Sequence, residues 1–86
     1  MKPLVHVTSV EVLDSYRLRL GFEDGTSGDL DLTEELWGPV FAPLKDRSLF
    51  AQVSVDDVGG TIVWPNGADF APEWLYEVVA SQQAPR

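Results

Sequence analysis

The sequence predicts an α+β fold with an antiparallel three-stranded meander, irregular helical turns, a β-hairpin and a C-terminal helix. Apolar and polar residues alternate from Tyr16 to Phe22, as is typical of a half-buried strand. Two short β-branched runs flank a glycine-containing turn between residues 53 and 64, which indicates a hairpin. Pro72 opens a segment whose apolar residues recur at helical spacing. We therefore expect a single domain that spans residues 1–86.

The turn after the first alternating strand sets the register of the next one. A three-residue loop over Glu23–Gly25, with Gly25 in the left-handed conformation, pairs Leu18 with Leu30. A two-residue loop would instead place Asp31 opposite Leu18, on the apolar face. The three-residue loop is therefore predicted.

The preceding turn is predicted over Leu13–Ser15, which pairs Val12 with Tyr16. Upstream of this turn, Val5 and Val7 alternate out of step with Val10 and Val12, and this predicts a bulge near Thr8–Ser9. The opposite face of the sheet is then expected to carry two polar rows across the strands: Glu11, Arg17 and Asp31 in one row, and Ser9, Arg19 and Asp29 in the next.

The middle of the chain is predicted to be irregular. Thr33 is expected to cap a turn that begins with Glu34–Glu35, because acidic side chains suit a helix N-terminus. Gly38–Pro39 is expected to end that turn. Asp46 or Ser48 is expected to cap another brief helix.

A hairpin and a helix are predicted to follow. The strands Val53–Asp56 and Thr61–Trp64 are joined by Asp57–Gly60, and Pro65–Gly67 forms a tight turn. The helix that begins at Pro72 is expected to place these residues near one face: Leu75, Val78, Val79 and Gln82.

Composition excludes several classes of protein. The chain has 6 basic and 14 acidic residues and a net charge of −8, which argues against nucleic-acid binding. The absence of cysteine excludes disulfides and thiolate metal sites. No apolar stretch approaches the ~20 residues that cross a bilayer, and the N-terminal residues do not match a signal peptide. We expect a soluble, cytoplasmic protein that does not act at a membrane.

Groups that could carry catalysis are few. His6 is the only histidine, and we expect it to be an exposed strand residue. Asp29 and Asp31 form one carboxylate pair, but Glu34 stands where a calcium loop needs its glycine and no glutamate closes the loop. Asp56 and Asp57 form a second pair in a turn. The sequence therefore predicts no catalytic, metal or cofactor site, and it favours a protein that is not an enzyme.

The densest cluster of candidate binding residues lies between Trp64 and Tyr76. One interpretation is a recognition surface, because Trp and Tyr are favoured at interfaces. The other is structural: Asn66 and Gly67 make a turn, Asp69 bonds the backbone near the helix start, and Trp64 and Tyr76 fill the core. The structural interpretation is favoured for Asn66, Gly67 and Pro72, and the two are balanced for Trp37 and Trp74. The candidate interaction residues are Trp37, Trp64, Asn66, Asp69, Glu73, Trp74 and Tyr76.

A family resemblance rests on residues spread over nearly the whole chain: Tyr16-x-Leu18-x-x-x-Phe22-x-Asp24-Gly25, Asp31-Leu32, Phe41-x-x-Leu44-x-Asp46-x-x-x-Phe50, Trp64-Pro65-Asn66-Gly67-Ala68-Asp69, Pro72 and Leu75-Tyr76. This pattern resembles the bacterial domain-of-unknown-function 2442 family. The resemblance implies a small α+β module without established catalytic residues. It also implies that standalone members pair with a small protein encoded beside them, a pairing suggested to be toxin–antitoxin. The chain has no room for the helix-turn-helix of fused members, so we expect any regulatory role to work through a partner.

Two hypotheses about function follow. The first is a non-catalytic interaction module, an antitoxin-like partner of a small basic protein, for which the negative charge would speed association. The alternative is a small-ligand-binding or sensor domain, with a pocket between the sheet and the helix that begins at Pro72. A homodimer through an open sheet edge is a further expectation.

Overall fold

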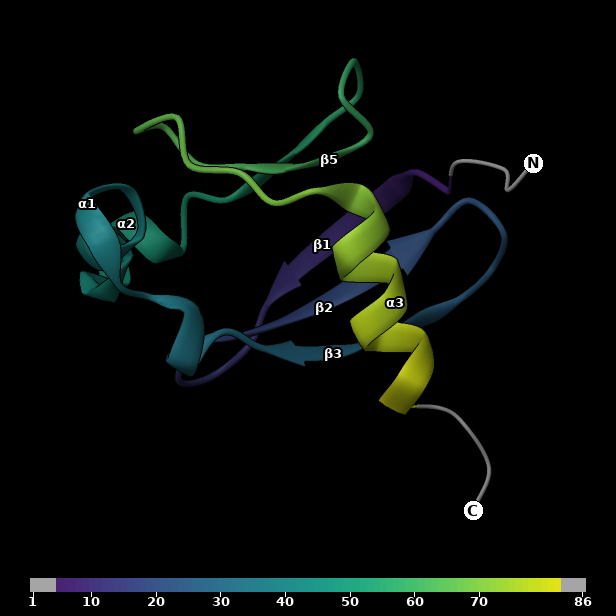
Figure 1. Cartoon of the computed structure of the whole chain (residues 1–86), viewed down its shortest axis with the longest axis horizontal. Helices are drawn as coiled ribbons and strands as arrows, with labels where there is room; N and C mark the ends of the chain where they lie inside the picture. The colour runs from purple at the N-terminus through teal and green to yellow at the C-terminus, as the bar shows by residue number, and fades with distance from the viewer. Residues whose placement is uncertain (1–4, 83–86) are drawn as a thin grey trace.

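A computed structural model describes residues 5–82 and confirms the α+β class (Figure 1). Strands β1, β2 and β3 form one antiparallel sheet in that order, and β4 and β5 form a second sheet of two strands. Three helices and two 3-10 helices complete the part of the chain that the structure describes. In chain order the elements are β1 (Val7–Val12), β2 (Arg17–Phe22), β3 (Ser27–Asp31), η1 (Thr33–Glu35), α1 (Gly38–Phe41), η2 (Ala42–Lys45), α2 (Arg47–Phe50), β4 (Ser54–Asp56), β5 (Thr61–Val63) and α3 (Pro72–Gln82).

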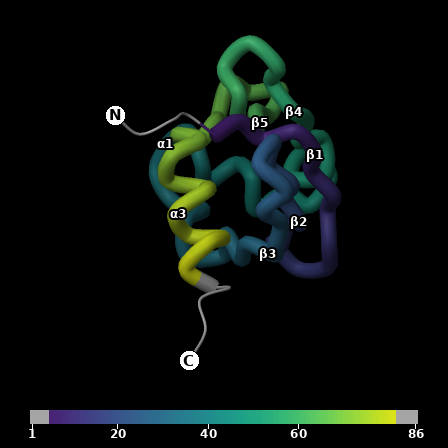
Figure 2. The backbone as a smooth tube through the Cα atoms, turned by 90° about the vertical axis from the view of Figure 1, so that its right-hand side faces the viewer, coloured from purple at the N-terminus to yellow at the C-terminus, as the bar shows by residue number. Residues whose placement is uncertain are grey.

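Helix α3 lies across one face of the β1–β2–β3 sheet, while the short helices gather at one end and the β4–β5 hairpin lies beside β1 (Figures 1 and 2). The side chains of β2 alternate between a buried face and a polar face. A single apolar core fills the space between the covered face of the sheet, α3, the short helices and the hairpin. Its buried members are Val7, Leu18, Leu20, Phe22, Leu30, Leu32, Leu36, Leu44, Phe50, Ile62, Trp64, Ala68, Leu75 and Val79.

The predicted register between β2 and β3 is confirmed. Leu18 lies opposite Leu30, and the turn between the strands is closed by the Gly25 amide, which donates to the Phe22 carbonyl at 3.0 Å. Gly25 has a φ of +91°, the left-handed conformation that a side chain disfavours. The Asp24 carboxylate accepts the Thr26 amide at 2.9 Å and further fixes this turn.

The predicted register between β1 and β2 is wrong by two residues. Val12 pairs with Leu18 instead of the predicted Tyr16, and Tyr16 lies in the loop, which spans Asp14–Tyr16. Asp14 binds Arg17 at 2.8 Å across this loop. The Tyr16 ring leaves the strand and packs edge-on against Phe50, with centroids 5.3 Å apart. A shift of two residues keeps every side chain on its own face, so alternation could not distinguish the two registers.

The polar rows on the opposite face change with this register. Glu11 lies opposite Arg19 rather than Arg17, and Arg19 in turn lies opposite Asp29. The predicted pairing of Arg17 with Asp31 is confirmed as a backbone register. The predicted bulge is also confirmed, because the β1–β2 register shifts between Val7 and Ser9.

In the middle of the chain, Thr33 is not the cap that was predicted. Leu32 occupies the cap position of η1, and the Asp31 carboxylate accepts both the Thr33 amide, at 2.9 Å, and the Thr33 hydroxyl, at 2.6 Å. The Thr33 side chain therefore donates to the Asp31 carboxylate instead of capping the turn. Gly38 and Pro39 begin α1, whereas η1 has already ended at Glu35. The cap at Asp46 is confirmed, since its carboxylate accepts the Ser48 amide at 2.9 Å.

The hairpin, the tight turn and the C-terminal helix are confirmed. Gly67, at a φ of +89°, donates its amide to the Trp64 carbonyl at 2.9 Å. On α3, Leu75 and Val79 are fully buried and Val78 is half-buried, while the side chain of Gln82 is outside the part that the structure describes.

His6 is half-buried rather than exposed, because its ring packs against Gly60 in the β4–β5 turn. The backbone on both sides of the ring explains this position. The Val7 amide donates to the Gly60 carbonyl at 3.0 Å, and the Glu23 amide donates to the His6 carbonyl at 3.0 Å. Within residues 5–82, none of the helices has the length and apolar character needed to cross a membrane.

Candidate functional site

Trp64 links the hairpin to the short helices from inside the core. Its side chain is 2% exposed, and its indole nitrogen donates to the Phe50 carbonyl at 2.9 Å. Its backbone amide donates to the Ala68 carbonyl at 2.9 Å and closes the turn. A buried indole with a satisfied N–H is a structural group, so Trp64 does not present its ring to a partner.

Asn66 connects this turn to α1. Its side-chain amide donates to the Val40 carbonyl at 3.1 Å, and its side-chain oxygen accepts the Ala68 amide at 3.1 Å. One side chain therefore shapes the turn and holds a neighbouring helix that lies 26 residues earlier in the sequence. Asn66 acts on the surface around α1 by positioning it.

A column of aromatic rings runs from the core towards this surface. Phe70 stacks on Phe41 with centroids 4.8 Å apart, and on its other side it stacks on Trp74 at 5.2 Å. Trp64 meets Phe70 edge-on at 6.0 Å and supports it from within. The stacked rings give the surface a rigid floor, because each ring is held by its neighbours.

Trp37 stands beside this column and is 71% exposed. The residue before it, Leu36, is buried, whereas Gly38 after it has a φ of +86° and is followed by Pro39. The chain therefore turns sharply on both sides of the indole and holds it outward. Val40, one helical turn on, is 46% exposed.

These residues enclose an open, mostly apolar groove of about 320 Å³, which we call the aromatic groove. Its lining consists of Glu35, Trp37, Gly38, Pro39, Val40, Phe41 and Phe70. A second hollow of about 440 Å³, which we call the acidic hollow, is lined by Asp31, Thr33, Glu34 and Glu35. Glu35 lines both, so the groove and the hollow meet at that residue.

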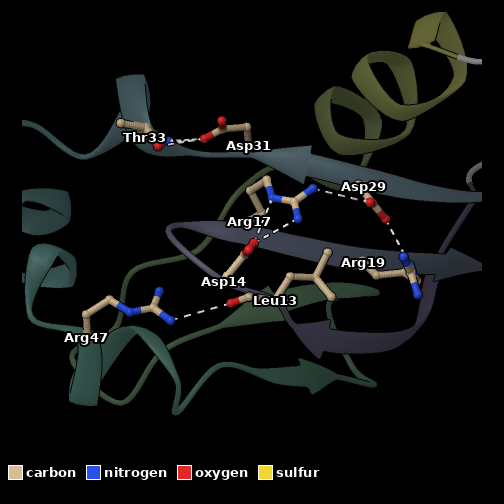
Figure 3. A network of polar contacts seen from close by, with 8 residues as sticks. All are labelled: Leu13, Asp14, Arg17, Arg19, Asp29, Asp31, Thr33 and Arg47. Carbon is tan, nitrogen blue, oxygen red and sulfur yellow. Dashed lines mark hydrogen bonds and ion pairs between the residues drawn. The ribbon is translucent and has the colours of Figure 1, made fainter.

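The charges of the molecule divide between two regions. On the solvent face of the β1–β2–β3 sheet, Arg17 binds Asp14 at 2.8 Å and Asp29 at 3.5 Å (Figure 3). Arg19 binds Asp29 at 2.9 Å and Glu11 at 3.9 Å. The hydrogen bond from Arg19 holds the pKa of Asp29 below its usual range, which keeps this network ionised.

The acids of the acidic hollow have a different environment. Hydrogen bonds from the Thr33 hydroxyl and amide lower the pKa of Asp31, so its carboxylate is charged at neutral pH. Within residues 5–82, neither Glu34 nor Glu35 forms an ion pair with a basic side chain. The hollow therefore carries negative charge that no ion pair among the described residues neutralises.

The remaining candidate residues lie away from the lining of the groove. The Tyr76 hydroxyl donates to Asp24 at 2.7 Å and lowers the pKa of that carboxyl, and its ring meets Phe22 edge-on at 5.1 Å. Glu73 is exposed in the first turn of α3. Asp69 is exposed and pairs with Val63 through the backbone, and among residues 5–82 its carboxylate makes no hydrogen bond to the helix start, contrary to expectation.

The structure adds four residues that the sequence analysis did not select as candidates. Glu35, Val40, Phe41 and Phe70 line the groove together with Trp37. Phe41 and Phe70 are 29 positions apart in the sequence, and no local pattern predicts that they stack. The available signal is the apolar run at residues 36–41, in which Gly38 and Pro39 interrupt any regular helix or strand.

The arrangement suits binding through an apolar surface next to negative charge. Among residues 5–82, no group of three or more His, Asp or Glu side chains is placed to hold a metal ion. The groove has one ionisable lining residue, Glu35, and the rest of its lining is apolar or backbone.

A family model described as "Protein of unknown function (DUF2442)" matches residues 7–80 of the chain. Comparisons with curated proteins and with solved structures gave no match.

Proposed function

The chain belongs to the DUF2442 family, whose function is unknown, and we propose that it is a non-catalytic protein-interaction module that binds a small basic protein. The observation that carries the proposal is the exposed Trp37 at the rim of the aromatic groove. Tryptophan is enriched among residues that dominate binding energy, and its exposure next to an apolar groove is costly in a protein that acts alone.

Charge supports a basic partner. The net charge is −8, and the ion pairs among the described residues gather on the solvent face of the β1–β2–β3 sheet. Glu34 and Glu35, which form no ion pair among residues 5–82, lie next to the groove instead. A partner with Lys or Arg around an apolar anchor would complement both features, and the long-range attraction would speed its association.

An antitoxin-like role in the cytoplasm is the specific form of this proposal. The family resemblance supports it, because standalone members are suggested to pair with a small protein encoded beside them. In this role the groove would cover an apolar surface of the basic partner and so block its activity. The absence of cysteine is compatible with a reducing compartment.

The test is affinity purification of the tagged full chain from its host at low salt, with three baits run in parallel. The parent and Val58→Ser baits should retain a small basic protein at near one-to-one ratio, while Trp37→Ser should lose it. Val58 is 96% exposed in the β4–β5 turn and serves as the matched control for removing an exposed apolar side chain. Equal retention by the Trp37→Ser bait would contradict the proposal.

The volume of the groove favours a second candidate, a small-ligand-binding or sensor domain. At about 320 Å³ the groove reaches the lower end of the range of small-molecule pockets. A thermal-shift screen against metabolites would reveal a ligand as a concentration-dependent rise in Tm that Trp37→Ser removes. A flat screen would leave the protein-binding proposal as the stronger one.

A further inference from the structure

We propose that the aromatic groove and the acidic hollow form one two-part site, which recognises a chain segment with a large apolar side chain directly beside an arginine or lysine. This inference rests on the proposed function and specifies which part of the basic partner is bound. The junction at Glu35 carries it, since this residue lines both the groove and the hollow.

The groove is the apolar half of the site. Its floor is the stacked pair Phe41 and Phe70, and Trp37 forms its exposed rim. Asn66 holds α1 from the Val40 carbonyl, so the lining is ordered before anything binds. A preformed apolar surface binds an apolar side chain with little further ordering cost.

The hollow is the charged half. Glu34 is exposed and Glu35 is half-buried, and neither is ion-paired with a basic side chain within the described part of the chain. A cation at the junction would meet the Glu35 carboxylate, and the exposed Trp37 ring beside it offers a cation–π contact. Partial burial of Glu35 makes this attraction stronger than it would be in open water.

Other occupants fit the charges less well. A second copy docked through the same patch about a two-fold axis would bring two acidic hollows together, and like charges would repel. A nucleic acid would bring phosphates to the same acids. A segment that combines an apolar side chain with a cation complements both halves.

The test uses the full chain and three capped dipeptides as probes: N-acetyl-Leu-Arg-amide, N-acetyl-Leu-Glu-amide and N-acetyl-Gly-Arg-amide. Binding is followed by the NMR shift of the Trp37 indole N–H, which is assigned by its loss in Trp37→Phe. The Leu-Arg probe should shift this signal saturably, with an affinity about fivefold above that of either other probe. Equal affinity for Leu-Arg and Leu-Glu, or no shift of the Trp37 signal with Leu-Arg, would overturn the inference.

Two variants locate the charge effect. Glu35→Gln should weaken the Leu-Arg probe about three- to fivefold and leave Leu-Glu no weaker. Glu23→Gln removes the same charge from an exposed position in the β2–β3 turn and should leave both affinities unchanged. If Glu35→Gln disturbs the remaining spectrum, Glu34→Gln replaces it, with the same expectation in the same direction.

The two proposals fail in different ways. If the probes do not discriminate by charge but the purified partner still depends on Trp37, the two-part site is wrong and the interaction module stands. If the Leu-Arg probe binds as expected but retention of a partner does not depend on Trp37, the two-part site stands and the basic-protein partner is wrong.

Discussion

Replacing Trp64 by Phe tests whether this residue acts from the core. The indole N–H donates to the Phe50 carbonyl at 2.9 Å in a buried position, and its loss leaves that carbonyl without its donor. An unpartnered buried acceptor costs about 1–3 kcal/mol. The smaller ring also leaves space between Phe50 and Phe70, whose centroids lie 5.9 and 6.0 Å from that of Trp64, which adds about 1–2 kcal/mol.

Together these effects predict a loss of about 2–5 kcal/mol in the free energy of unfolding. A domain of 86 residues has a total of about 4–13 kcal/mol, so this single substitution removes a large share of it. At about 4–8 °C per kcal/mol, a loss of about 3 kcal/mol lowers Tm by roughly 12–24 °C.

The assay is urea unfolding followed by circular dichroism, because the substitution itself alters tryptophan fluorescence. Trp37→Phe is the matched control: its ring is 71% exposed, and we expect a change below about 0.5 kcal/mol. A loss below about 1 kcal/mol for Trp64→Phe, or equal losses for the two variants, would refute the division into a structural and a surface tryptophan.

Three further substitutions test local features of the fold. Gly25→Ala places a side chain at a φ of +91° and should cost about 1–2 kcal/mol in urea unfolding; a cost near zero would contradict the strained turn. Asp46→Ala removes the acceptor of the Ser48 amide and should cost about 1 kcal/mol, whereas Asp46→Asn should keep most of the stability. Tyr76→Phe removes the main cause of the lowered pKa of Asp24. A carboxyl pKa below the ordinary value of 3.8 stabilises the fold at higher pH, and this gain is lost as the pH falls through the lowered pKa. Tyr76→Phe should therefore reduce Tm at pH 7, and the difference from the parent should shrink as the pH of the melt falls below 3.8. A difference that stays constant with pH would contradict the link to Asp24.

The sequence predicted the order of the strands because alternation and turn chemistry agree along β2 and β3. Gly25 specified both the loop length and the register of that pair, and the structure has it at a φ of +91°. The β1–β2 turn offered no equivalent residue. Its register depends on where Tyr16 goes, and Tyr16 packs on Phe50, 34 positions later. A tertiary contact decided what the local pattern left open.

The candidate site shows the same division. Trp37 could be selected from the sequence because it stands next to Gly38 and Pro39, outside any regular apolar stripe. Phe70 and Phe41 could not be joined to it, since the contact between them depends on how α1 is placed. Asn66 controls that placement through the Val40 carbonyl, and its role as a turn residue concealed the second bond.

If the proposed function holds, the block from Trp64 to Asp69 supports the binding surface without supplying the contact surface itself. Trp64 supports Phe70 from the core, and Asn66 holds α1, so the groove forms where these two supports meet. Rigid support of this kind reduces the ordering cost that an exposed side chain such as Trp37 pays on binding. Substitutions in the block should change binding through the shape of the groove, whereas substitutions at Trp37 and Glu35 should change it through direct contact.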